Sequence, residues 1–204
     1  KSLKIDKKSL VGDVEKIRKV AALFLQKGVE QDDCIILSAS QSPSFVYAYF
    51  ATHLIGATAV PVDPQVSSTQ LNFIAHATYA RTAFLYKYVT VKGVSDVALI
   101  DSLLGLGNEP VGLKTLSFPK LSDRADILFT TGTTGTPKGV VLTHQNILAS
   151  ATNINTFIQN TSEDLELIPL PLSHSFGLGR LRCNFLLGAS IALANGFLLP
   201  GKIF

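Results

Sequence analysis

Apolar residues recur at helical spacing near the start of the chain, at Leu10, Val14, Ile17, Ala21 and Phe24. Residues three and four positions apart lie on one face of a helix, so this pattern predicts an amphipathic helix that packs against the rest of the molecule. Gly28 follows, where a helix C-terminus favours a residue that tolerates a positive φ. The helix is therefore predicted to end there.

Short apolar runs then alternate with helical segments. The runs predicted as strands are 34–40, 58–64, 81–86 and 96–100, and the predicted helices are 43–56 and 67–78. Pro43 opens the first of these helices and Gly56 closes it. Because parallel strands need crossover connections, the alternation predicts an α/β fold with layered, mostly parallel sheets and helices on their faces.

The segment 101–123 is rich in Gly, Pro, Ser and Asp, and it predicts a long irregular connection. We expect it to join two α/β subdomain portions. Beyond it, strands are predicted at 125–131, 138–144 and 190–194, with an apolar run at 164–172 between them. A helix at 145–158, capped by Thr143, and another from about Gly177 to Leu187 complete the pattern.

Composition narrows the classes of partner. With 47% hydrophobic and 16% charged residues the chain predicts a globular protein, and its net charge of +3 comes from scattered basic residues, which disfavours nucleic acid. The most apolar stretch, Phe185–Leu199, is shorter than the ~20 residues of a transmembrane segment and is interrupted by polar residues and glycines. The first ten residues lack the apolar run of a secretory signal. We therefore expect a cytoplasmic protein without a transmembrane segment.

The two cysteines and the chain ends suggest the state of the thiols and the extent of the protein. Cys34 and Cys183 are too far apart in sequence for a metal knuckle, so reduced core cysteines are expected and no metal-ligating set is predicted. The chain begins at Lys1, contains no Met and stops after an apolar segment, with a mean hydropathy of +0.32. We expect a piece of a longer protein, which would expose apolar surface and tend to self-associate.

The segment from Thr130 to Val140, TTGTTGTPKGV, is the most specific chemical signal. Glycines let a backbone approach an anion closely, exposed N–H groups and Thr hydroxyls donate hydrogen bonds to phosphate oxygens, and Lys138 adds positive charge. The Walker A spacing fails because Pro137 stands five residues after Gly132, and the dinucleotide pattern fails at Thr134. A flexible linker would need neither the Pro-Lys-Gly nor flanking strands. The candidate phosphate-binding residues are Thr130, Thr131, Gly132, Thr133, Thr134, Gly135, Thr136, Pro137, Lys138 and Gly139.

This loop resembles the signature phosphate loop of the adenylate-forming superfamily, which includes acyl-CoA synthetases, aryl-CoA ligases, luciferase and the adenylation domains of nonribosomal peptide synthetases. The turn from Gly56 to Pro64 is similar to another stretch of that family, and PLPLSHSFGL from Pro169 to Leu178 resembles its acyl-binding motif. The resemblance implies ATP and Mg2+ as cofactors. It also implies that Lys138 acts at the phosphates and that His174 lines the acid tunnel beside the α-phosphate.

The resemblance also implies a reaction: a small-molecule carboxylic acid attacks ATP to give an acyl-adenylate, and the acyl group then passes to a thiol. Family members that activate amino acids usually carry an Asp in the acyl-binding motif, but no acidic residue lies between Pro171 and Arg180, so a fatty or aryl acid is favoured. Coenzyme A and carrier-protein phosphopantetheine both stay open as acceptors. Arg180 and Arg182 are expected as solvated helix cations outside the site, and His53, His76 and His144 are left as structural residues.

Several family motifs have no counterpart among these residues: the aromatic-Gly-x-Thr-Glu segment, the ribose-binding Asp and the carboxy-terminal domain with its adenylation Lys. We therefore expect residues 1–204 to form the amino-terminal part of a large adenylation domain, with the carboxy-terminal domain absent and little activity alone. The alternative class is a non-catalytic α/β module that binds a nucleotide or serves as a scaffold.

Overall fold

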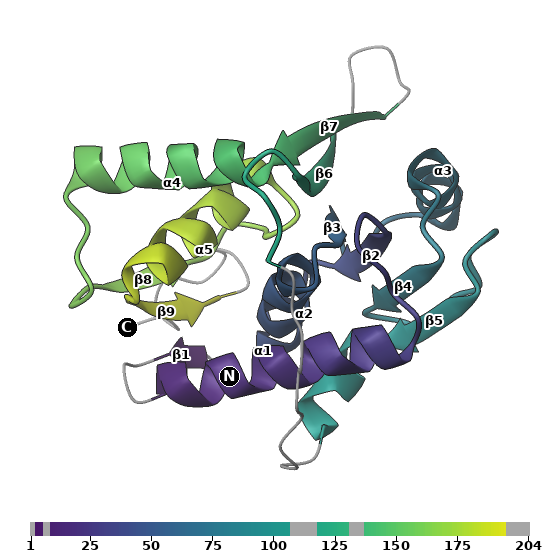
Figure 1. The fold of residues 1–204 in the computed structure, drawn as a ribbon, viewed down its shortest axis with the longest axis horizontal. Coiled ribbons are helices and arrows are strands. Elements are labelled where there is room, and N and C mark those ends of the chain that lie inside the picture. Colours follow the sequence, from purple (N-terminus) through teal and green to yellow (C-terminus); the bar gives the residue numbers. More distant parts are fainter. Residues whose placement is uncertain (1–2, 6–8, 107–117, 131–136, 195–204) are drawn as a thin grey trace.

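The computed structural model describes residues 3–5, 9–106, 118–130 and 137–194, with side chains from Val14 onward (Figure 1). Its strands are β1 Leu3–Ile5, β2 Cys34–Ser38, β3 Thr58–Val62, β4 Thr82–Leu85, β5 Asp96–Leu99, β6 Arg124–Thr130, β7 Lys138–Thr143, β8 Leu165–Ile168 and β9 Ser190–Leu193. Its helices are α1 Ser9–Gln26, α2 Pro43–Leu54, α3 Ser68–Thr78, the 3-10 helix η1 Ile100–Gly105, α4 His144–Ile158 and α5 Ser175–Leu187.

A six-stranded sheet forms the larger half of the molecule, in the order β5-β4-β2-β3-β6-β7. Every neighbouring pair in it is parallel except β6 and β7. The chain between these two strands is too short for a crossover connection, so they can pair only as an antiparallel hairpin. The predicted α/β class with mostly parallel sheets is confirmed.

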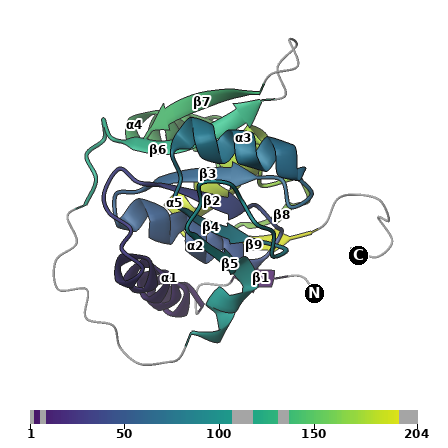
Figure 2. The ribbon, with the colours of Figure 1, turned by 90° about the vertical axis from the view of Figure 1, so that its right-hand side faces the viewer.

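Strand β2 lies at the centre of this sheet and is buried on both faces. Ile35 and Leu37 belong to the apolar cluster that includes α1 and α2, whereas Cys34 and Ile36 belong to the cluster with α3. Successive side chains of a strand point to opposite faces, so the helices must cover both. Figure 2 shows α3 on one face of the sheet and α1 and α2 on the other.

A second sheet has three strands in the order β1-β9-β8, in which β1 pairs with β9 antiparallel and β8 pairs with β9 in parallel. Helices α4 and α5 accompany it (Figure 1). Ile168 of β8 and Ile191 of β9 share one apolar cluster with α2, which is buried along most of its length. Helix α2 therefore links the two sheets through a common core.

Most predicted helix boundaries agree with the structure. Ser42, with Pro43 behind it, caps α2, and Thr143 caps α4 in a reciprocal capping box with Asn146. Cys34 and Cys183 are buried free thiols, as expected. Helix α5 begins at Ser175, two residues before the predicted start.

One strand was not predicted, and one expectation needs correction. Strand β1 was not predicted, because three residues carry too little pattern to identify a strand. The segment 101–123 is not irregular throughout: η1 continues through Gly105, while 107–117 lies outside the described residues. Strands β6 and β7 follow this segment and join the same sheet as β2 to β5. The division into two subdomain portions stays a prediction.

No helix in the described part of the chain is long and apolar enough to cross a bilayer.

Candidate active site

The predicted phosphate loop connects the two strands of the β6–β7 hairpin. Thr130, the last residue of β6, pairs with Lys138, the first residue of β7, and both are exposed. The ends of the predicted loop are therefore paired with each other, with Lys138 at its base. The candidates from Thr131 to Thr136 lie outside the described residues, so the structure places only Thr130, Pro137, Lys138 and Gly139 of the predicted set.

Gly139 brings the returning strand close to β6. A Cβ atom at this position would lie 3.0 Å from Ile127 Cγ2 and 3.2 Å from Phe129 Cζ. Such contacts are tighter than ordinary packing distances, so a side chain here would require Ile127 and Phe129 to shift by a few tenths of an ångström. The glycine of the Pro-Lys-Gly sequence thus has a packing role at the base of the loop.

His174 is the N-cap residue of α5, directly after the loop that follows β8. Its backbone N–H donates to the Pro171 carbonyl at 3.2 Å, and its imidazole is exposed. No hydrogen bond or ion pair joins the side chains of Lys138 or His174 to another residue in the described ranges.

Gly177, three residues after His174, lies in close contact with the backbone of the preceding loop. A Cβ atom at Gly177 would lie 2.4 Å from the Pro171 oxygen and 2.8 Å from the Leu170 oxygen. Only glycine allows the first turn of α5 to rest directly on these two carbonyls. On the other side of the same loop, Gln41 Nε2 donates to the Leu170 oxygen at 2.5 Å.

A buried polar cluster surrounds Asp126 of β6, whose side chain is fully buried. Tyr49 on α2 donates its hydroxyl hydrogen to Asp126 Oδ2 at 3.0 Å, and His53 Nε2 lies 3.0 Å from Asp126 Oδ1. Arg182 on α5 completes the cluster: its Nη2 donates to Asp126 Oδ2 and its Nε donates to the Tyr49 oxygen at 2.8 Å. We call these four residues the Asp126 cluster.

The electrostatics of the cluster favour an ionised carboxylate. Burial alone would raise the pKa of Asp126, but the hydrogen bond and charge of His53, the charge of Arg182 and the hydrogen bond from Tyr49 hold that pKa below its usual value. Burial and the neighbouring Asp126 charge raise the pKa of Tyr49 well above its usual value, so the phenol remains a donor. Because folding lowers the pKa of Asp126, the cluster stabilises the fold above the unfolded value of about 3.9 and loses this contribution as the pH falls through the folded value.

The expectation that Arg180 and Arg182 are solvated helix cations is wrong. Arg180 donates from Nε and Nη2 to the two carboxylate oxygens of Glu166, both at 2.6 Å, and Arg182 is held in the Asp126 cluster. A buried carboxylate such as Asp126 needs a charged partner, and Asp126 and the partly buried Glu166 each pair with an arginine of α5. A single charge inside the apolar run ADILF was the available signal for Asp126.

The other histidines stay outside the predicted site. His53 Nε2 also lies 3.1 Å from the Ala125 oxygen, and since its neighbours are acceptors, this nitrogen carries the hydrogen. Burial, with the nearby charge of His53, lowers the pKa of His144. The part of the chain that the structure describes contains no group of three His, Cys, Asp or Glu residues that could hold a metal ion.

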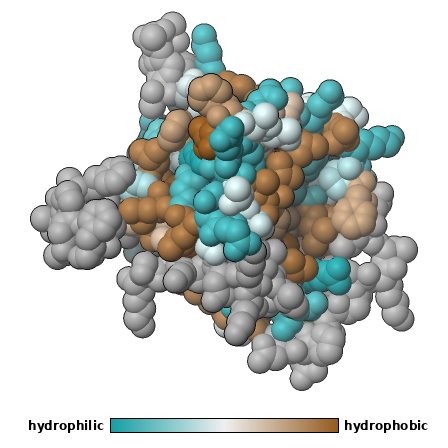
Figure 3. All heavy atoms as spheres, turned by 90° about the vertical axis from the view of Figure 1, so that its left-hand side faces the viewer, coloured by the Kyte–Doolittle hydropathy of each residue, from teal (hydrophilic) through white to brown (hydrophobic). Residues whose placement is uncertain are grey.

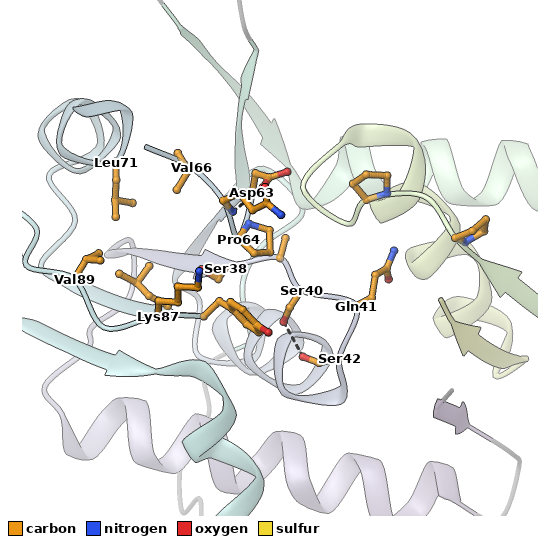
Figure 4. A pocket seen from close by; sticks show the side chains of 16 residues that line it. Ser38, Ser40, Gln41, Ser42, Asp63, Pro64, Val66, Leu71, Lys87 and Val89 are labelled. Carbon is orange, nitrogen blue, oxygen red and sulfur yellow. Dashed lines mark hydrogen bonds between the residues drawn. The ribbon is translucent and has the colours of Figure 1, made fainter. Parts of the chain in front are cut away.

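A cavity of about 970 Å³ opens where β2, β3 and β4 end. Ser38, Ser40 and Gln41 line it together with Asp63 and Lys87 (Figure 4). Ligands of parallel α/β sheets bind in crevices at the carboxyl ends of the strands. Sequence reasoning missed this cavity because three separate strand ends form it. Neither Lys138 nor His174 lines it, but Pro169 and Pro171, which precede His174, do.

Comparison with known proteins identifies the family. The AMP-binding enzyme family matches residues 14–203. The chain belongs to this family. Among curated relatives, the medium-chain fatty-acid–CoA ligase of Escherichia coli (strain K12) is 31% identical over 202 residues, which cover 87% of this chain and 36% of the ligase. The 4-coumarate:CoA ligase 1 of Petunia hybrida is 29% identical over 202 residues, covering 88% of this chain and 37% of that ligase.

Solved structures of AMP-binding enzymes share the fold. The O-succinylbenzoate coenzyme A synthetase of Bacillus subtilis in complex with AMP matches with a TM-score of 0.82 at 23% identity, covering 94% of this chain and 50% of that one. The inhibitor-bound N-terminal domain of FACL13 from Mycobacterium tuberculosis matches with a TM-score of 0.80 at 20% identity, covering 95% of this chain and 51% of that one. The chain thus spans little more than a third of the curated relatives, and the predicted resemblance to adenylate-forming enzymes is confirmed.

Proposed function

We propose that the intact protein activates a carboxylic acid with ATP and then transfers the acyl group to a thiol. The match to the AMP-binding enzyme family over residues 14–203 carries this proposal. The relatives named as fatty-acid–CoA and coumarate–CoA ligases support it. We also propose that the protein is cytoplasmic and that the 204 residues alone have little activity.

The reaction has two steps. A carboxylate oxygen of the acid attacks the α-phosphorus of ATP, a new P–O bond forms, and the bond to the leaving pyrophosphate breaks. The thiol sulfur then attacks the acyl carbon, AMP leaves with the oxygen that came from the acid, and the thiol proton is released. The chemistry consists largely of positioning and charge neutralisation.

The chain's own residues supply two parts of this chemistry. Lys138, exposed at the base of the hairpin loop, is proposed to pair with the β and γ phosphates, together with the N–H groups and Thr hydroxyls of 130–136. His174, exposed at the start of α5, is proposed to line the acid tunnel. Mg2+ is proposed to accompany the ATP phosphates.

A fatty or aryl acid is the proposed substrate. The stretch from Pro171 to Arg180 has no acidic residue to pair with the ammonium of an amino acid. The nearby Glu166 already accepts two hydrogen bonds from Arg180. Coenzyme A is the proposed acceptor because the relatives are named CoA ligases, and carrier-protein phosphopantetheine is the alternative that an acceptor assay distinguishes.

Acid-dependent exchange of labelled pyrophosphate into ATP tests the proposed function. The intact protein is expected to exchange label only when a fatty or aryl acid is present, and amino acids are expected to give little exchange. An intact protein that binds ATP but exchanges no label with a broad panel of acids would instead be the non-catalytic nucleotide-binding module.

Replacing His174 by alanine is expected to change activation of the acid more than binding of ATP, because the imidazole is proposed to contact the acid. The measurement is the KM for each acid and for ATP in the exchange assay. His76→Ala is the matched control, since His76 is an exposed histidine near the end of α3. Unchanged constants in His174→Ala across fatty and aryl acids would make His174 structural.

The 204-residue chain is expected to self-associate, because it exposes large apolar side chains. Phe157 at the end of α4 is 88% exposed and Phe176 on α5 is 67% exposed. Figure 3 shows hydrophobic residues beside hydrophilic ones on one face of the molecule. Light scattering is expected to report species larger than the monomer, and Phe157→Ser to shift them toward the monomer. A monodisperse monomer without dye-accessible apolar surface would contradict this expectation.

A further inference from the structure

The Asp126 cluster joins the two parts of the chain that carry the proposed chemistry. Asp126 stands four residues before Thr130, so β6 leads directly from the cluster into the phosphate loop. Arg182 stands eight residues after His174, so α5 leads from the histidine back to the cluster. Asp126 and Arg182 contact each other directly, with side chains 0% and 10% exposed.

We propose that Asp126 and Arg182 are positioning residues that fix the β6–β7 hairpin, and with it Lys138, relative to His174. The catalytic part of this proposal rests on the proposed function. At about 1.5 Å per helical residue, Arg182 lies roughly 12 Å along α5 from His174. At about 3.3 Å per strand residue, Asp126 lies roughly 13 Å along β6 from Thr130. Neither residue reaches the reacting atoms, so both act through the elements that carry them.

The geometry of the cluster suits this role. The guanidinium of Arg182 donates to Asp126 through Nη2 and to the Tyr49 hydroxyl through Nε, and Tyr49 in turn donates to Asp126. Three side chains from α5, α2 and β6 thus close a ring of hydrogen bonds. A planar guanidinium held at two nitrogens fixes direction as well as distance, so α5 cannot slide along β6 without breaking a bond.

The energetics point to orientation more than to net stability. Buried ion pairs often contribute little to stability compared with apolar residues of the same volume, because both charges lose their hydration. Catalysis by contrast depends strongly on distance, since a misplacement of 1 Å can slow a reaction about a hundredfold. A contact that ties β6 to α5, the helix that begins after His174, is therefore expected to act mainly on the rate.

The chain contains a matched control for this role. Arg180 lies on the same helix and also pairs with a partly buried carboxylate, Glu166. That pair joins α5 to β8 and does not involve β6. Arg180→Met and Arg182→Met each remove one arginine–carboxylate pair from α5, but only Arg182→Met cuts the link to β6.

Hydrogen–deuterium exchange on the chain measures the link between α5 and β6 and does not depend on enzymatic activity. Arg182→Met is expected to speed amide exchange in β6 and β7, whereas Arg180→Met is expected to speed it in β8 and to leave β6 and β7 as in the unsubstituted chain. Equal exchange in β6 and β7 for the two variants would overturn the proposed link. If Arg182→Met does not fold, the double variant Asp126→Asn/Arg182→Met, which removes both charges together, gives the same comparison.

Pyrophosphate exchange in the intact protein tests the consequence for catalysis. Arg182→Met is expected to lower kcat about tenfold to a hundredfold more than Arg180→Met does, with smaller changes in the KM for ATP and acid. Equal kcat values in the two variants would refute the positioning role. An unsubstituted protein without exchange would refute the proposed function and the catalytic role together, while hydrogen exchange would still decide the structural link.

Discussion

Lys138→Ala is expected to slow acid-dependent ATP–pyrophosphate exchange about tenfold to a hundredfold. A charge-assisted hydrogen bond to phosphate contributes about 1.5 to 3 kcal/mol, and each 1.4 kcal/mol changes a rate about tenfold. Lys138 is exposed at the base of the hairpin loop and forms no ion pair with another described residue, so we expect its charge to act on a phosphate.

Lys120→Ala is the matched control for this prediction. Lys120 is also exposed and lies four residues before β6, away from the loop, so its loss is expected to leave the exchange rate unchanged. If Lys138→Ala and Lys120→Ala exchange label at the same rate, Lys138 does not contact the phosphates.

Gly177→Ala is expected to destabilise the fold by about 1 to 3 kcal/mol, the usual effect of overpacking. The new Cβ atom would meet the Pro171 oxygen at 2.4 Å and the Leu170 oxygen at 2.8 Å, and backbone carbonyls cannot move aside as a flexible side chain can. The start of α5 must then shift, and His174 shifts with it. Urea unfolding monitored by circular dichroism measures the change.

Gly179→Ala, two residues further along α5, separates this clash from helix propensity. A Cβ atom at Gly179 meets nothing within 4 Å. Alanine there is expected to stabilise the helix by up to about 1 kcal/mol, because glycine is the poorer helix former. Similar unfolding midpoints for the two variants would mean that α5 does not rest on the 170–171 backbone.

Local sequence patterns predicted the elements that depend on neighbours along the chain. The buried run at β2, the start of α2 at Pro43 and the cap at Thr143 were predicted because each involves only a few adjacent residues. The phosphate loop, which stays a prediction, rests on a local pattern of the same kind. Strand β1 was missed because it depends on pairing with β9, near the other end of the described chain.

The Asp126 cluster and the cavity depend on tertiary contacts that the sequence does not reveal. Asp126 and Arg182 are 56 positions apart, and no local pattern connects them. A charge within an apolar strand indicates that some partner must exist, because an unpaired buried carboxylate is costly. Only the fold shows that this partner is Arg182, because it brings the Arg182 side chain on α5 to Asp126 on β6.

Oxygen transfer from the acid to AMP tests acid activation most directly. The intact protein is incubated with ATP, coenzyme A and a fatty or aryl acid whose carboxylate carries oxygen-18, and the products are analysed by mass spectrometry. Attack of the carboxylate on the α-phosphorus predicts one labelled oxygen in each AMP formed, with none in pyrophosphate. Label in inorganic phosphate with formation of ADP, or thioester formed without label in AMP, would contradict activation through an acyl-adenylate.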